Sequence, residues 1–182
     1  MGLKAENGRD IVSEARASLL ASPWLSNCSP EFSHALLDRA IVRLSPPGAT
    51  LFHAGDEGGG LFGIARGTVE LSLFLDHPDT SIMHLGHAGY WAGTRPLIGR
   101  VRVLGVIARD EVLWALVPLH EARSLLDASP HWWRHIAELV DDNCEIAISA
   151  MADLTRADSR MRAMATLLRL AGCRYSGPPG RG

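Results

Sequence analysis

The sequence is poor in cysteine, has a single lysine and contains no long apolar run, and each shortage excludes a class of protein. Its three cysteines, Cys28, Cys144 and Cys173, are far apart and show neither the C-x2-C spacing of a zinc site nor a disulfide framework. They also fall short of the four thiolates that an iron–sulfur cluster needs. No stretch of about 18 apolar residues offers a membrane span, and residues 1–20 lack a signal-peptide core. We therefore predict a cytoplasmic protein with reduced thiols, no metal site and no membrane partner.

An excess of charge is also missing, because the net charge is -2 over 182 residues. Such a balance gives no overall signal for a nucleic-acid partner. The basic side chains gather in residues 154–182, which contain six arginines and one acid. These arginines could contact phosphates without sequence specificity, but we favour a solvated helix face. The preference for arginine over lysine fits a GC-rich bacterial coding sequence as well as any binding role.

The pattern of residues changes twice along the chain and predicts helices, then strands, then helices. Residues 10–20 form an amphipathic stretch, and Ser29-Pro30 has the features of an N-cap for a helix through Ala40. Between residues 49 and 117, short apolar runs alternate with Gly, Pro and Asp at intervals of about ten residues. This spacing is typical of an all-β sandwich, barrel or jelly roll.

A long helix is predicted after Ser129-Pro130, and its apolar residues favour a coiled-coil dimer. One seam position is Asn143, a residue type that fixes register and two-strandedness in parallel dimers at a cost in stability. A long helix buried against its own domain would show a similar stripe, and that alternative stays open. The seam follows spacings of three and four residues and consists of Trp133, Ile136, Val140, Asn143, Ala147, Ala150 and Leu154.

The residues after the long helix predict a second, shorter helix. Asp158 has the side chain of an N-cap, and Gly172 suits the C′ position after a helix that runs to Ala171. Beyond it, residues 176–182 are Ser, Gly, Pro and Arg only, and we expect this tail to be disordered.

The stretch from Gly55 to Leu73 is the most informative part of the sequence. It predicts a strand, a tight turn at Gly67 and a second strand, with Val69 and Leu71 on one face by the period of two. The pattern is G-D-x4-L-F-x-I-x2-G-x-V-x-L. Because it fixes glycines and apolar positions over many residues, it is far more specific than an isolated glycine motif.

This motif resembles the signature of the cyclic-nucleotide-binding β-roll of the Crp/Fnr transcription regulators. The resemblance implies a mainly β protein with helices (α+β), built on a jelly roll, or double-stranded β-helix. It assigns residues 1–128 to the β-roll with its N-terminal helices, residues 129–156 to a dimerisation helix, and residues 157–182 to the start of a winged-helix DNA-binding domain. The recognition helix of that domain is expected well beyond Leu170, so we expect the winged helix to be truncated.

The resemblance extends to residues 91–108, which we call the cassette and in which a strand from Val101 to Ala108 is expected. In the family, a glutamate of this segment accepts the ribose 2′-hydroxyl and an arginine pairs with the cyclic phosphate. Arg102 matches the arginine, whereas Gly93 stands in place of the glutamate and Val103 in place of a hydroxyl residue. The ligand-binding residues that the resemblance implies are Trp91, Ala92, Gly93, Thr94, Arg102 and Val103.

The departures at positions 93 and 103 predict weak nucleotide binding. Each lost hydrogen bond to a charged group removes roughly 1.5–3 kcal/mol, so two losses weaken binding by about 100-fold or more. Pro96 also removes an N–H donor from the cassette. cAMP and cGMP therefore stay open as effectors but are not favoured, and the sequence identifies no other cofactor.

Together these features predict a non-enzymatic ligand-sensing and dimerisation module of a Crp/Fnr-type regulator, without catalytic residues. Its expected partners are a second copy of the chain and an unidentified small-molecule effector, with DNA added only if a complete helix-turn-helix follows. Two alternatives stay open: a cupin-type metalloenzyme on the same jelly roll, and a dimerisation scaffold with a non-functional pocket. The cupin is disfavoured because the rings of His84 and His87, three residues apart in a strand, would point to opposite faces.

Overall fold

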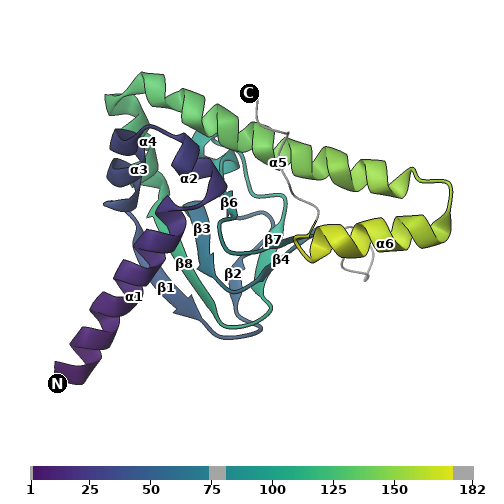
Figure 1. Cartoon of the computed structure of the whole chain (residues 1–182). Helices are drawn as coiled ribbons and strands as arrows, with labels where there is room; N and C mark the ends of the chain where they lie inside the picture. Colours follow the sequence, from purple (N-terminus) through teal and green to yellow (C-terminus); the bar gives the residue numbers. More distant parts are fainter. Residues whose placement is uncertain (1, 74–80, 174–182) are drawn as a thin grey trace, which may run out of the picture. The chain divides into compact units, whose positions relative to one another are not determined.

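The computed structural model describes residues 2–73 and 81–173 (Figure 1). The chain divides into two compact units, residues 1–139 and 140–182. The first unit contains all the strands described below and the helices before residue 133, and the second contains the last part of a long helix and the helix that follows. The predicted disordered tail, residues 176–182, lies outside the described residues.

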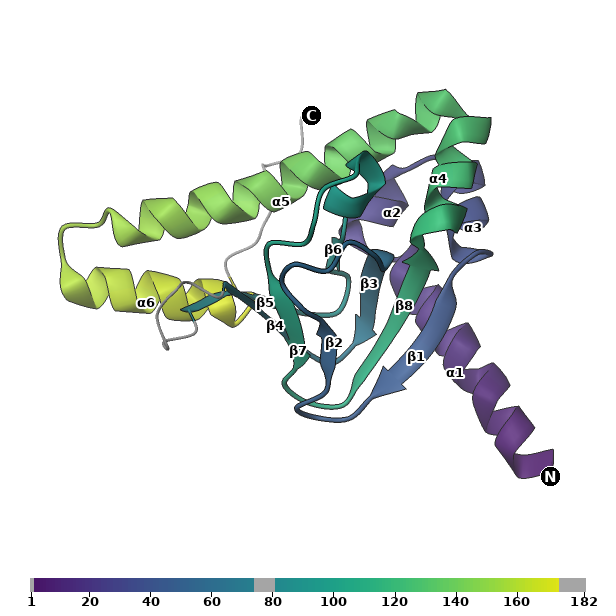
Figure 2. The same cartoon turned by 180° about the vertical axis from the view of Figure 1, so that it is seen from behind.

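Among the described residues, the strands form two four-stranded antiparallel sheets. The first sheet (Figure 1) has the strand order β1 (Ile41–Ser45), β8 (Val112–Pro118), β3 (Gly60–Arg66) and β6 (Trp91–Ala92). The second sheet (Figure 2) has the order β2 (Thr50–Phe52), β7 (Gly105–Ala108), β4 (Val69–Leu73) and β5 (Ser81–Gly86). This jelly-roll-like antiparallel body with flanking helices confirms the predicted fold class.

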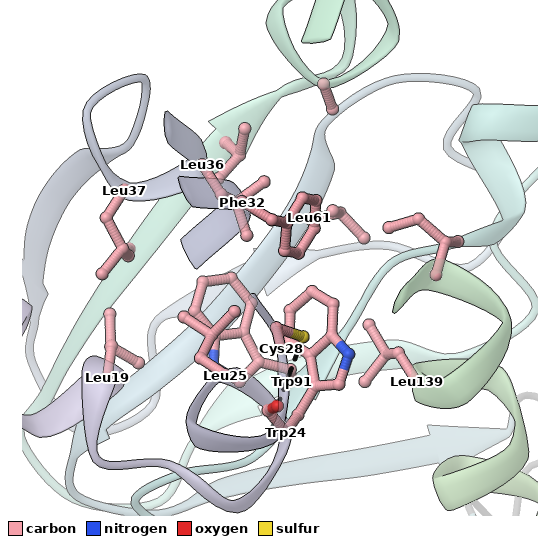
Figure 3. Close-up of a cluster of buried hydrophobic side chains, with 14 of the residues drawn as sticks. Leu19, Trp24, Leu25, Cys28, Phe32, Leu36, Leu37, Leu61, Trp91 and Leu139 are labelled. Carbon is pink, nitrogen blue, oxygen red and sulfur yellow. Dashed lines mark hydrogen bonds between the residues drawn. The ribbon is translucent and has the colours of Figure 1, made fainter. Parts of the chain in front are cut away.

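The two central strands of the first sheet, β3 and β8, are buried on both faces, and this explains why they are nearly continuous apolar runs, whereas the edge strand β1 is largely exposed. Along β3, Phe62 and Ile64 belong to the core between the two sheets, whereas Leu61 and Ala65 belong to a second core on the outer face. The alternation follows from the period of two along a strand. The roll therefore has an inner core, between its sheets, and an outer core, between the first sheet and the helices (Figure 3).

Helices of the first unit build the outer core. α1 (Gly2–Leu20) and α4 (Leu119–Ala128) pack on β3 and β8. The short α2 (Pro23–Asn27) and α3 (Pro30–Leu37) contribute Trp24 and Phe32, whose rings meet edge to face at 5.9 Å between centroids. Ser22 caps α2, a helix that the sequence did not reveal because five residues are too few to show a helical period.

The predicted cap of α3 is confirmed, but its predicted end is wrong. The Ser29 hydroxyl accepts a hydrogen bond from the N–H of Phe32 at 3.4 Å. The helix ends at Leu37 rather than at Ala40, because the N–H groups of Arg39 and Ala40 bond three residues back instead of four. This tightened turn leads directly into β1.

The predicted strand from Val101 to Ala108 is also shorter in the structure, where β7 begins at Gly105. The backbone of Arg102 pairs with a turn instead of a neighbouring strand. Its N–H donates to the carbonyl of Asp56 at 2.9 Å, and its carbonyl accepts from the N–H of Gly55 at 2.7 Å. The apolar residues around position 102 have the pattern of a strand, but the backbone of this segment hydrogen-bonds to a turn and not to a neighbouring strand.

In the second unit, α6 (Ser159–Leu170) has the caps that the sequence predicts. Asp158 accepts hydrogen bonds from the N–H groups of Arg160 at 2.7 Å and Met161 at 3.2 Å. At the other end Gly172 has a φ of +70°, which suits the residue after a helix. Buried Asp153 joins this helix to the preceding one through an ion pair with Arg169 at 3.5 Å.

The long helix α5 (Trp133–Leu154) divides the predicted dimer seam into two parts. Ile136 is buried in the outer core, and Trp133 packs against that core, so this end of the seam serves the chain itself. Val140 and Leu154 have exposed fractions of 48% and 69%. The other seam residues are exposed (Ala147) or half-buried (Asn143 and Ala150). The dimer stays a prediction, which now concerns residues 140–154.

None of the helices in the described part of the chain is long and apolar enough to cross a membrane.

Candidate functional site

The cassette begins on β6 and continues through a 3-10 helix, η1 (Arg95–Ile98), that long-range hydrogen bonds hold in place. The Arg95 side chain donates to the carbonyl of Val101 at 2.9 Å and closes the loop after the helix. Arg123, on α4, donates to the carbonyls of Pro96 at 2.7 Å and Leu97 at 3.3 Å. Two carbonyls of η1 thus accept hydrogen bonds from a cation on another helix, and the Pro96 carbonyl also accepts the N–H of Gly99 at 3.1 Å.

Arg102 lies buried at the centre of this segment, with an exposed fraction of 6%. Its Nη2 donates to the carbonyl of Gly60 at 2.6 Å, and its Nε donates to the carbonyl of Gly58 at 3.3 Å. The guanidinium carbon stands 3.8 Å from the ring centroid of Phe52, a cation–π contact. The turn before β3 and the ring of β2 therefore hold the one cassette arginine that matches the family.

Burial also changes the acid–base behaviour of Arg102. Desolvation lowers the pKa of its guanidinium to about 10, and the nearby carboxylate of Asp56 partly opposes this by raising the pKa. The side chain stays protonated at neutral pH. It is a pre-formed positive group whose hydrogen bonds now go to backbone carbonyls.

Gly93 stands where the family has its glutamate, and the backbone there excludes a side chain. Its φ is +101°, and a Cβ added at this position would lie 2.3 Å from the carbonyl oxygen of Gly60. The same Gly60 carbonyl accepts the short hydrogen bond from Arg102. The Gly60 carbonyl oxygen thus accepts the guanidinium N–H of Arg102, and position 93 offers no carboxylate that could bind a ribose.

The other predicted ligand residues have different surroundings in the described part of the chain. Trp91 is buried in the outer core (Figure 3). Its indole N–H donates to the Ser22 hydroxyl at 3.2 Å. Its ring packs edge to face on Trp24 at 5.2 Å. Ala92 packs instead on the inner core, Thr94 is half-buried, and Val103 has an exposed fraction of 44%. Trp91 is thus committed to the chain's own packing.

Tyr90 is a residue at this site that sequence reasoning missed. Its ring packs on the inner core beside Phe62 at 6.4 Å and His84 at 5.4 Å between centroids. Burial raises the pKa of its phenol, so the hydroxyl is neutral at any physiological pH. Gly86 leaves room for this ring, since a Cβ there would lie 2.7 Å from it.

The two histidines considered for a cupin-like site have different surroundings. His84 lies on β5 against Tyr90, while Nδ1 of His87 is 3.5 Å from the Thr68 hydroxyl. This arrangement gives no support to the cupin alternative.

With this geometry in view, comparison with known proteins becomes informative. Residues 42–129 match the family model of the cyclic nucleotide-binding domain. This segment has the cyclic nucleotide-binding fold, and it contains the cassette with Arg102. No curated protein sequence matches the chain significantly.

Several solved structures resemble the chain over most of its length. One, named for cyclic nucleotide binding and from Ruegeria pomeroyi DSS-3, is 18% identical with a TM-score of 0.63, covering 88% of this chain and 72% of its own. Another, named as a cAMP-binding regulatory protein of Silicibacter pomeroyi DSS-3, is 18% identical with a TM-score of 0.64 and coverages of 88% and 74%. The N-terminal domain of a transcriptional regulator from Streptomyces coelicolor A3(2) is 21% identical with a TM-score of 0.57 and coverages of 78% and 99%.

Proposed function

We propose that this chain is the ligand-sensing and dimerisation module of a cytoplasmic transcription regulator of the Crp/Fnr type, and that it binds cAMP and cGMP weakly or not at all. The observation that carries the proposal is the cassette: it keeps the buried arginine of a cyclic nucleotide-binding fold but has Gly93 and Val103 where the family's polar side chains stand. The effector would be a small molecule other than these nucleotides. DNA would be read by a helix-turn-helix outside the described residues.

Contacts within the first unit support a route from the cassette to the long helix. Arg123 connects η1 to α4 through its two carbonyl hydrogen bonds. α4 leads through the short 3-10 helix η2 (Pro130–Trp132) into α5. A ligand that moved η1 would therefore also shift α4 and the start of α5, which is the kind of two-state element that a regulator needs.

Calorimetric titration tests the nucleotide part of the proposal. We expect cAMP and cGMP to bind no tighter than about 100 µM, because two lost hydrogen bonds to charged groups cost roughly 3–6 kcal/mol relative to a micromolar receptor. The measurement compares the native chain with Arg102→Lys and with Arg100→Ala, a matched control at an exposed arginine of the same cassette.

Micromolar binding that disappears in Arg102→Lys and survives in Arg100→Ala would contradict this reading and make the chain a cyclic-nucleotide receptor. Circular dichroism of each variant ensures that lost binding is not lost folding. If neither nucleotide produces binding heat, the chain is a sensor of another effector or a dimerisation scaffold. The scaffold alternative predicts no response to any effector.

Dimerisation through the exposed part of α5 is a separate prediction. We expect the double variant Val140→Lys/Leu154→Lys to raise the dimer dissociation constant by about 100-fold or more, since burying each of these side chains contributes about 1.5–3 kcal/mol. Ala152→Lys places the same charge elsewhere on the helix, at an exposed position outside the seam, and should leave dissociation unchanged. Sedimentation equilibrium measures the dissociation constant of the native chain and of both variants. A native chain that is monomeric at every concentration measured would refute the dimer seam.

A further inference from the structure

Three metal-ligating side chains that lie far apart in the sequence meet in the first unit. They are Cys28, directly after α2, and His135 and Glu138, in the first turns of α5. One donor atom from each residue lies within 4.8 Å of the donors of the other two. We propose that this cluster is a binding site for a divalent transition metal of the zinc class.

The cluster is built from the core outward. Cys28 and His135 are buried, with exposed fractions of 8% and 5%, and the Glu138 side chain is 45% exposed. A thiol and an imidazole thus form the floor of the site, and a carboxylate closes it from the solvent side. Figure 3 shows Cys28 among the packed side chains of the outer core, beside Trp24 and Trp91.

Packing holds the two buried donors in place before any ion arrives. The N–H of Cys28 bonds to the carbonyl of Leu25 at 3.2 Å, which fixes the residue as the C-cap of α2. The His135 ring lies on Phe32 at 4.8 Å between centroids, and the His135 carbonyl accepts the indole N–H of Trp24 at 2.8 Å. Donors with fixed orientations lose little freedom when they bind a metal.

An ion can reach the cluster from the surface. A hollow of about 500 Å³ opens beside it and is lined by Asn27, Cys28, Ser29, Glu31, His131, Trp132, Arg134 and His135. Arg134 is the cation in this lining, and its side chain is 71% exposed, with Nη2 3.5 Å from one Glu138 oxygen. That contact is a solvated surface pair, which a metal ion can replace at little cost.

The donor set fits zinc-class chemistry. Sulfur, imidazole nitrogen and carboxylate oxygen are the three ligand types of zinc, and water can supply the fourth position of a tetrahedron. In such a tetrahedron the donor atoms lie about 3.4–3.6 Å apart, so separations that here reach at most 4.8 Å must shrink by no more than about 1.3 Å. Nδ1 of His135 already stands 3.0 Å from Oε2 of Glu138. On binding, the thiol releases its proton, and the metal replaces any proton that these two atoms share.

A bound ion would tie the end of α2 to the first turns of α5. The metal would therefore stabilise the packing of these first turns, which belong to the first unit, on the outer core, independently of any ligand in the cassette. The site needs neither the cassette nor a dimer, so its test stands apart from the proposed function.

Titration with Co²⁺ and Zn²⁺ tests the site, with tag-free protein stripped by a chelator. The background is Cys144→Ser/Cys173→Ser, since both of these cysteines are exposed and would otherwise bind metal on their own. We expect one Co²⁺ per chain with a thiolate-to-cobalt charge-transfer band, displaced by Zn²⁺. Thermal unfolding should shift upward with Zn²⁺ because the metal binds the folded state.

Two variants decide the assignment. Cys28→Ser should abolish the charge-transfer band, and Glu138→Gln, at a half-exposed position that leaves the core intact, should weaken metal affinity by more than about 100-fold, since even the outer partners of metal ligands cost about 10–100-fold. Glu145→Gln, at an exposed acid of the same helix, should change nothing. Absence of the band, or a band and affinity unchanged in Glu138→Gln, would overturn the proposal.

Discussion

Replacing Gly93 with glutamate is expected to destabilise the protein rather than to restore a nucleotide site. At a φ of +101° a side chain is strained by about 1–3 kcal/mol. Its Cβ would also lie 2.3 Å from the Gly60 oxygen, and relieving such an overlap costs about 1–3 kcal/mol more. The expected loss is roughly 2–6 kcal/mol, a large part of a typical domain's stability of about 5–15 kcal/mol.

Urea unfolding followed by circular dichroism measures this loss. Gly93→Ala adds the same Cβ without a carboxylate, so the alanine and glutamate variants should lose similar free energies of unfolding. Gly99→Ala is the matched control: its φ is +72°, but nothing lies within 4 Å of the added Cβ, so only the backbone cost of about 1–2 kcal/mol applies. A stable Gly93→Glu protein with tight cAMP binding would show that the backbone at this position yields easily.

Trp91→Ala is expected to cost about 3–5 kcal/mol of unfolding free energy, because it empties the largest fully buried side chain of the outer core. The neighbouring ring of Trp24 would lose its edge-to-face partner. Trp91→Phe keeps an aromatic ring and should cost clearly less, while Ile98→Ala, at an exposed position of the same cassette, should cost little.

Chemical unfolding of the three proteins checks the order of these losses. The same measurement is a control for binding experiments, because a variant at position 91 could lose ligand binding simply by unfolding. If Trp91→Ala were as stable as the native protein and impaired only in binding an effector, Trp91 would be a ligand residue, as the family resemblance implies.

Features set by near neighbours in the chain were accessible from the sequence. The caps Ser29 and Asp158 were predicted because an N-cap bond spans only three residues. The jelly roll followed from a long motif and the spacing of turns. By contrast, the extent of the strand before Ala108 depended on a distant turn at Gly55, which no local pattern reports.

The sites depend still more on contacts between distant segments. Arg102 was found by its place in the motif, but its carbonyl partners at Gly58 and Gly60 come from another part of the chain. Trp91 was expected beside a ligand, although the pleat of β6 turns it toward the helices. The spacing of Cys28 and His135 predicted no metal site, because only the docking of α5 on α2 brings them together.

The side chain of Arg123 gives the first unit a property that follows from thermodynamic reciprocity. Its hydrogen bonds to the carbonyls of Pro96 and Leu97 close a ring that runs through β7, β8 and α4 back to η1. If an effector bound at the cassette changed the affinity of α4 for a partner by some factor, binding of that partner to α4 would change the affinity for the effector by the same factor. A macromolecule that docks on α4 would therefore act as an effector of the cassette without entering it.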